Sequence, residues 1–141
     1  MQIFKVEQWM VRNVITVGPQ TPISIAAELM AQNNIGSLIV VENGEPIGII
    51  TEQDIVRKVV ATKKLPEQVP VAEVMSKKIV TAEKGTTINE ISDLMVKHRV
   101  KRIPVVENGK LCGIITSTDI VRTMAAFNKL YDVKDIIELG A

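Results

Sequence analysis

The sequence predicts an α/β (α+β) fold in which two βαββα units pack together with pseudo-two-fold symmetry. The first observation is an internal repeat, because residues 10–57 align with residues 75–122 without a gap and 19 of the 48 aligned positions are identical. The second observation is the same order of apolar patterns in both repeats, and the third is an Asn-Gly pair at equivalent places. A unit of about 50 residues buries too little apolar surface alone. We therefore expect the two units to pack on each other.

Each repeat begins with a short extended segment, residues 14–17 and 79–82, and continues with an amphipathic helix. Thr21 followed by Pro22 predicts the N-cap and the first position of the first helix. Apolar residues at spacings of three and four form one buried stripe on each helix. These residues are Ile23, Ala26, Ala27, Leu29 and Met30 in the first repeat, and Ile88, Ile91, Leu94 and Met95 in the second.

Two strands around an Asn-Gly turn follow each helix, at residues 37–41 and 47–50 and again at 102–106 and 112–115. Asn-Gly tolerates the positive φ angles of a tight hairpin. The strands are apolar nearly throughout, which predicts that both faces of each sheet are covered. A second helix is expected over about residues 52–62 in the first repeat and 117–130 in the second.

These patterns divide the chain into five segments. We expect an N-terminal extension over residues 1–8, a first domain over 9–62, a linker over 63–71 and a second domain over 72–126. Residues 127–141 form a tail whose part from Leu130 to Leu139 has the pattern of an amphipathic helix. Trp9 and Met10 are expected to pack on the core.

Composition excludes several classes of protein. The 17 basic and 16 acidic residues leave a formal charge of +1, and aromatic residues make up only 3%. This balance argues against a surface that tracks nucleic acid. Cys112 lies in an apolar run and is read as a small buried hydrophobe, and one histidine, His98, cannot form a histidine-based metal site. Neither a signal peptide nor an apolar run of about 20 residues is present, so we expect a cytoplasmic protein without a membrane span.

The motif Gly-x-x-Thr-x-x-Asp occurs in both repeats, with Thr51 and Asp54 in the first and Thr116 and Asp119 in the second. Each threonine lies where a strand ends and a helix begins, so its hydroxyl and the free backbone N–H groups suit a phosphate. The aspartate could accept hydrogen bonds from a ribose diol. The same spacing is also that of a capping box, which needs no ligand. The duplication, the preceding glycine and the additional hydroxyl of Thr118 favour a ligand site.

A basic cluster surrounds the junction between the first helix and the second strand of the second repeat. For Lys97, His98 and Arg99 the favoured interpretation is a solvated helix C-terminus. Lys101 and Arg102 directly precede the strand and are candidates for phosphate contacts, whereas the equivalent Gly36 and Ser37 carry no charge. Arg57 and Arg122 follow the aspartates by three residues, which favours salt bridges within the helix.

The chain resembles the cystathionine-β-synthase (CBS) domain family, in which a tandem pair forms a Bateman module. The resemblance covers residues from about Trp9 to about Ala126. It rests on the β-α-β-β-α order, on the segment VKRIPVVENGKLCGIITSTDI and on the two threonine–aspartate motifs. The resemblance implies a domain pair that is not itself catalytic. Domain pairs of this family bind AMP, ADP, ATP or S-adenosylmethionine between the two halves and regulate enzymes, transporters and kinases, including the energy-sensing AMP-activated kinase.

The resemblance implies two composite ligand sites. In one, Thr51 and Asp54 would hold phosphate and ribose, and the opposite half would hold adenine through Ile79, Val80 and Thr81. In the other, Thr116, Thr118 and Asp119 would be completed by Ile15, Thr16 and Val17. Residues before the second strand would line the clefts, namely Ile35, Gly36, Ser37, Lys101 and Arg102. Gln53 stands where Thr118 does in the second repeat, so the sites should not be equivalent.

From these observations we expect a regulatory module that binds an adenine nucleotide, uses no catalytic cofactor, forms a homodimer and acts on a separate partner protein that the sequence does not identify. An alternative is a ligand-free module for protein interaction or oligomerisation, in which the threonine–aspartate pairs are only caps. Binding of S-adenosylmethionine or of nucleic acid through the basic cluster near Arg102 are further alternatives. No arrangement of catalytic groups is recognisable.

Overall fold

The computed structural model describes residues 4–130, which form two three-stranded sheets with helices. In the first half, β1 (Thr16–Val17) runs parallel to β2 (Ser37–Glu42), and β2 pairs with the antiparallel β3 (Glu45–Thr51). Helix α2 (Ile23–Asn33) lies between β1 and β2 in the sequence. Helix α3 (Glu52–Ile55) follows β3 and continues as the π-helix η1 (Val56–Val60). The first repeat therefore has the predicted βαββα order.

The second half repeats this topology, as the sequence predicts. Strand β4 (Ala82–Glu83) runs parallel to β5 (Arg102–Glu107), which pairs with the antiparallel β6 (Lys110–Thr116). Helix α4 (Ile88–His98) precedes β5, and α5 (Ser117–Leu130) follows β6. The predicted tail helix at residues 130–139 lies almost entirely outside the described residues. No helix in the described part of the chain is long and apolar enough to cross a membrane.

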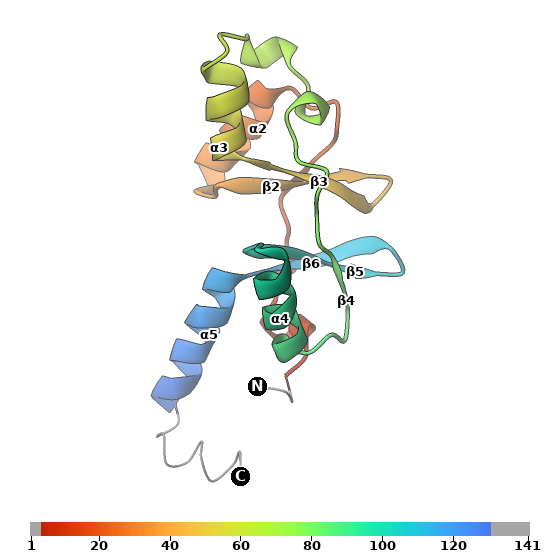
Figure 1. Ribbon diagram of the computed structural model, residues 1–141, viewed down its shortest axis with the longest axis vertical. Helices are drawn as coiled ribbons and strands as arrows, with labels where there is room; N and C mark the ends of the chain where they lie inside the picture. Colours follow the sequence, from red (N-terminus) through yellow and green to blue (C-terminus); the bar gives the residue numbers. More distant parts are fainter. Residues whose placement is uncertain (1–3, 131–141) are drawn as a thin grey trace.

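The two sheets face each other at the centre of the molecule, and the helices cover their outer sides (Figure 1). Helices α2 and α3 cover the first sheet and α4 covers the second, whereas α5 begins at the end of β6 and extends away from the sheet. Each half has its own apolar core. Ile23, Leu38 and Ile50 are fully buried in the first core, and Ile91, Ile103 and Ile115 in the second. Cys112 packs against the second core, and partial burial raises the pKa of its thiol.

Each half also takes a segment from outside its own repeat. Helix α1 (Val6–Trp9) packs in the second core, where Val6 is fully buried. The equivalent segment of the second repeat, with Val71 and Val74, packs in the first core. It contains the short 3₁₀ helix η3 (Val71–Glu73), which follows η2 (Pro66–Gln68). Val6, in the expected N-terminal extension, is therefore part of the second core. The region expected to be a linker, residues 63–71, contributes core residues to the first half.

The backbone hydrogen bonds of these exchanged segments obey the expected pseudo-two-fold symmetry. The amide of Val6 donates to the carbonyl of Thr86, and the amide of Val71 donates in the same way to the carbonyl of Thr21, both at 2.8 Å. Two antiparallel bridges join Val11 to Ile114 and Ile49 to Ser76. Because 11 and 76, and 49 and 114, are equivalent positions, exchanging the two repeats maps each bridge onto the other.

Gly48 and Gly113 of the repeated motif are needed for this exchange. A β-carbon on Gly48 would lie 2.7 Å from the sulfur of Met75 and 2.9 Å from the carbonyl oxygen of Ser76. A β-carbon on Gly113 would collide with the side chain of Met10. We expected these glycines to let a ligand come close. The group that comes close is a methionine of the crossing segment, so their role is packing.

The hairpin tips of the two halves are joined directly. Asn43 and Asn108 each have a φ of 53°, and the glycines that follow them also have positive φ, as the Asn-Gly turns predict. The ammonium group of Lys110 donates to the carbonyl of Asn43 at 2.6 Å, and the amide of Leu111 donates to the carbonyl of Gly44 at 2.9 Å. The two sheets are thus held together at one end.

The predicted N-cap of the first long helix is wrong. Pro22, not Thr21, is the N-cap of α2, and no side chain caps this helix. The hydroxyl of Thr21 instead accepts a hydrogen bond from the amide of Gly18 at 3.1 Å, which turns the chain before the helix. The helix after β3 is not α-helical throughout, because the amide of Ala61 bonds to the carbonyl of Val56 five residues earlier.

Candidate ligand-binding clefts between the two halves

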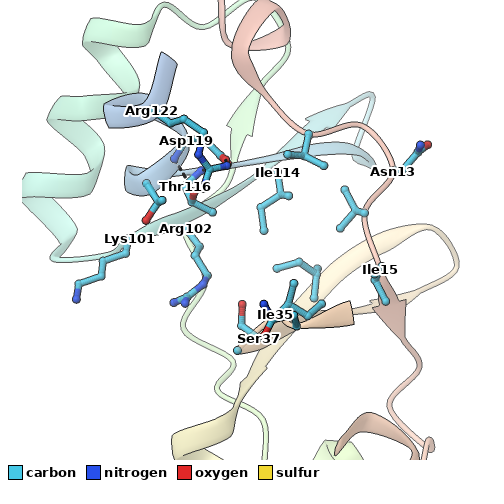
Figure 2. Close-up of a pocket in the computed structure, with 16 residues that line it drawn as sticks. Asn13, Ile15, Ile35, Ser37, Lys101, Arg102, Ile114, Thr116, Asp119 and Arg122 are labelled. Atoms are coloured by element: carbon cyan, nitrogen blue, oxygen red, sulfur yellow. Dashed lines mark hydrogen bonds and ion pairs between the residues drawn. The ribbon is translucent and has the colours of Figure 1, made fainter. Parts of the chain in front are cut away.

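A cleft of about 480 Å³ lies between the two halves. One wall comes from the second half, with Arg102 at the start of β5 and Thr116 and Asp119 at the start of α5. The opposite wall comes from the first half. Figure 2 shows Arg102 extending from its strand toward Ile35 and Ser37 of that half. The cleft is large enough for a nucleotide-sized ligand, since such sites typically measure about 300–1,000 Å³.

The beginning of α5 positions the polar groups of this larger cleft. The amide of Thr116 donates to Oδ2 of Asp119 at 3.1 Å, and the amide of Asp119 donates to the hydroxyl of Thr116 at 3.0 Å. This is a capping box, which fixes both side chains. Oδ1 of Asp119 takes no part in the cap and lies 3.9 Å from Nη1 of Arg122. The cap and a ligand site are compatible, because the cap uses only one carboxylate oxygen.

Apolar side chains form the rest of the larger cleft. Val14 and Ile15 come from the segment before β1, Ile35 and Ile39 from the region around the start of β2, and Ile114 from β6. These groups can cover the faces of a flat ring, and the polar groups at the start of α5 can bind hydroxyl or anionic groups. The cleft thus combines an apolar part with a hydrogen-bonding and cationic part.

A smaller cleft of about 270 Å³ lies at the pseudo-symmetric position. All ten residues that line it are equivalents, 65 positions away, of residues that line the larger cleft. They are Ile49, Thr51, Lys78, Ile79, Val80, Arg99, Val100, Lys101, Arg102 and Pro104. Lys101 and Arg102 line both clefts.

Asp54 does not line the smaller cleft. Its Oδ2 accepts hydrogen bonds from the amide and the hydroxyl of Thr51, at 3.1 and 3.0 Å. Its Oδ1 lies 3.4 Å from the ammonium group of Lys58, which also donates to the carbonyl of Val74 at 3.0 Å. The residue equivalent to Lys58 in the second repeat is Thr123, which carries no charge. Both oxygens of Asp54 therefore already have partners within the chain.

The structure places most of the candidate residues in one of the two clefts. The larger cleft is lined by Ile15, Ile35, Gly36, Ser37, Lys101, Arg102, Thr116, Thr118 and Asp119. The smaller cleft is lined by Thr51, Ile79, Val80, Lys101 and Arg102. Four candidates line neither cleft, namely Asp54, Thr16, Val17 and Thr81. Val17 packs in the first core, whereas Thr16 and Thr81 are exposed.

Sequence reasoning missed several lining residues. Asn13 directly precedes the expected extended segment, Val14 is its first residue, and Asn34 follows the apolar stripe of the expected helix. Their equivalents Lys78, Ile79 and Arg99 line the smaller cleft. The sequence favours a solvated helix end for Arg99, but the residue lines the smaller cleft. Comparing the two repeats position by position was the available signal, since a residue that lines one cleft marks its equivalent in the other.

Comparison with known proteins identifies the fold and its two repeats. The model of the CBS domain matches residues 6–61 and again residues 71–126. The chain belongs to the CBS domain family. Both matches start at the exchanged segments, at Val6 and Val71, so each CBS domain as the family defines it includes a piece that packs on the other one.

Relatives of this CBS pair include proteins of archaea and bacteria. The chain is 45% identical over 114 residues to the uncharacterized protein MK0525 of Methanopyrus kandleri, covering 79% of this chain but only 58% of that protein. It is 36% identical over 115 residues to the CBS domain-containing protein YhcV of Bacillus subtilis, covering 82% of this chain and 81% of the relative.

One solved structure similar to this CBS pair contains ligands. It is the CBS domain pair of protein MJ0100 in complex with 5′-methylthioadenosine and S-adenosyl-L-methionine. The two structures have a TM-score of 0.77 and 28% sequence identity, and the match covers 88% of this chain and 98% of that one. A CBS pair of closely similar architecture therefore binds adenosyl compounds.

Proposed function

We propose that this CBS pair is a non-catalytic regulatory module that binds an adenosine-containing ligand in the larger cleft and signals to a partner protein in the cytoplasm. The observation that carries the proposal is the 480 Å³ cleft, in which Thr116, Thr118 and Asp119 of one half face Ile15 and Ile35 of the other. The apolar residues suit an adenine ring. Oδ1 of Asp119, which takes no part in the cap and has only the distant Arg122 beside it, suits a ribose diol, because a carboxylate oxygen has two acceptor sites.

The charges around the cleft favour a phosphorylated ligand, such as AMP, ADP or ATP. Lys101, Arg102 and Arg122 line it, and Asp119 is the one carboxylate among its lining residues. Lysine and arginine side chains are the usual partners of phosphate oxygens. The MJ0100 pair, whose ligands are 5′-methylthioadenosine and S-adenosylmethionine, supports the adenosyl part of the proposal.

Isothermal titration with AMP, ADP, ATP, S-adenosylmethionine and 5′-methylthioadenosine tests the proposal. We expect saturable binding of at least one nucleotide. A free ligand concentration of 100 times the dissociation constant should then raise the free energy of unfolding by about 2.7 kcal/mol. If none of the five compounds produces heat or a thermal shift, the proposal is contradicted. The interaction module is then the remaining interpretation.

We also propose that the module forms a homodimer. Large apolar side chains are exposed on the helical segments that follow β3 and β6, namely Val56 and Val60 on η1 and Val121 and Met124 on α5. Exposed apolar surface on a small domain is typical of an interface. Light scattering at micromolar concentration should give twice the chain mass of 15.5 kDa. A measured mass equal to that of one chain would refute the dimer.

A further inference from the structure

The smaller cleft is unlike the larger one in charge. Among the ten residues that line it are four cations, Lys78, Arg99, Lys101 and Arg102, and no carboxylate. Asp54, whose equivalent Asp119 lines the larger cleft, is bonded to Thr51 and Lys58 instead. Positive charge that is concentrated in a concave site attracts anions strongly, since low-dielectric walls focus the field.

None of these four positions is basic in the first repeat. The equivalent residues are Asn13, Asn34, Gly36 and Ser37. The shared fold therefore does not require a cation at any of them, because the first repeat forms the same turns and strands without one. All four cations come from the second repeat, and two of them, Lys78 and Arg99, line the smaller cleft but not the larger one.

The backbone of Arg99 supports a role for its side chain. Arg99 ends α4 in the left-handed conformation, with φ of 55°, and its equivalent Asn34 ends α2 with φ of 52°. Asparagine adopts this conformation readily, whereas a long side chain does so at a cost. An arginine at this position is therefore unfavourable for the backbone, and its side chain lines the smaller cleft.

The size of the cleft limits what can bind there. At about 270 Å³ it lies just below the range of about 300–1,000 Å³ that is usual for drug-sized ligands. We infer that the smaller cleft is a separate site for a small phosphoryl anion such as pyrophosphate, which Lys78, Arg99, Lys101 and Arg102 hold without a nucleoside. This site goes beyond the adenosyl site proposed above and does not depend on it.

Lys78 and Arg99 provide the test, because they line only the smaller cleft, whereas Lys101 and Arg102 also line the larger one. The double variant Lys78→Asn/Arg99→Asn replaces both cations with asparagine, which is the residue at the equivalent positions of the first repeat, Asn13 and Asn34. Both side chains are exposed, and asparagine suits the backbone at position 99. The variant should therefore fold. Isothermal titration with sodium pyrophosphate at fixed ionic strength should show one site in the wild type and at least tenfold weaker binding in the variant.

The double variant Lys64→Asn/Lys97→Asn is the matched control. It removes the same amount of charge from exposed positions that line neither cleft. Its affinity for pyrophosphate should stay within twofold of the wild type. Three results would each overturn the inference: no binding of pyrophosphate to the wild type, unchanged binding in Lys78→Asn/Arg99→Asn, or equal weakening in the control. Because no adenosyl compound is used, failure here is distinguishable from failure of the proposed function.

Discussion

Each aspartate of the two repeated motifs divides its carboxylate oxygens between two partners. Oδ2 of Asp54 and of Asp119 closes a capping box with the threonine three residues before it. Oδ1 of Asp54 has Lys58 at 3.4 Å, while Oδ1 of Asp119 has the more distant and largely exposed Arg122 at 3.9 Å. Identical motifs therefore leave one carboxylate available to a ligand and the other engaged.

This difference predicts unequal effects of the same substitution. Asp119→Asn should weaken binding of the adenosine-containing ligand by roughly tenfold or more, because a hydrogen bond to a charged group contributes about 1.5–3 kcal/mol. Asp54→Asn is the matched control and should leave the affinity for that ligand unchanged. Isothermal titration of both variants measures the difference. Equal losses in the two variants would show that Asp54 serves a ligand despite Lys58.

At the scale of single residues, the sequence predicted which side chains line the clefts better than it predicted which groups those side chains contact. The repeated motif singled out Thr116, Thr118 and Asp119, and all three line the larger cleft. The sequence did not reveal that both carboxylate oxygens of Asp54 have partners within the chain, although the spacing of four residues between Asp54 and Lys58 is that of an ion pair in a helix. It also suggested that Gly48 and Gly113 admit a ligand, since no local pattern shows that Met75 and Met10 lie over them.

At the scale of elements, the two helices that precede the central hairpins start differently. Helix α4 begins with a capping box, in which the amide of Glu90 donates to the hydroxyl of Thr87 at 3.2 Å and the amide of Thr87 donates to Glu90 at 3.1 Å. Helix α2 has no side-chain cap, because Pro22 stands at the position of Thr87. The Thr-Pro pair predicts a side-chain cap in the first repeat, where the structure has none. No cap is predicted from the sequence of the second repeat, where the structure has one.

Removal of this cap gives a prediction for stability. Thr87→Ala should lower the free energy of unfolding by about 1 kcal/mol, because an amide at the helix start loses its acceptor. Thr87→Ser keeps the hydroxyl and should stay close to the wild type. Urea denaturation followed by circular dichroism measures both. A loss of the same size in the serine variant would mean that the methyl group, rather than the cap, is responsible.

Strands and hairpins were the most predictable elements. The hairpin strands β2, β3, β5 and β6 lie within about two residues of their expected bounds, because the apolar runs end at Asn-Gly turns and at the threonines that begin the next helices. Strand β4 begins three residues later than expected. The change from α3 to η1 could not be predicted. The equivalent residues of the second repeat continue as the α-helix α5, so the difference depends on tertiary contacts that local propensity does not describe.

On the scale of the whole molecule, the two halves are interdependent. Helix α1 fills part of the second core, and the segment that contains η3 fills part of the first. A carboxylate oxygen of Glu7 accepts a hydrogen bond from the amide of Gly85, which helps to lower the pKa of Glu7 together with its own backbone hydrogen bond. The pseudo-two-fold packing was predictable from the repeat, but the exchange was not, because an apolar pattern does not show which core it joins.

This interdependence predicts that the described region unfolds as one cooperative unit. Val6→Ala removes two buried methyl groups from the second core and should cost about 1–2 kcal/mol, at about 0.8 kcal/mol per group. The midpoint in urea should fall by the same amount for circular dichroism and for the fluorescence of Trp9, the only tryptophan. Val11→Ala, at an exposed position, is the control and should change the midpoint little. Two separate transitions would contradict a single unit.

The exchanged segments also determine the order in which the molecule can be completed during synthesis. Val6 and Met10 are synthesised about 100 residues before Ile103, Val105 and Ile115, with which they share a core. The first half likewise lacks Val71 and Val74 until the second repeat has begun. Contacts between residues far apart in sequence form slowly. The apolar segment around Val6 therefore stays without its core partners until the second repeat has been synthesised, and exposed apolar surface of this kind makes a growing chain prone to aggregation.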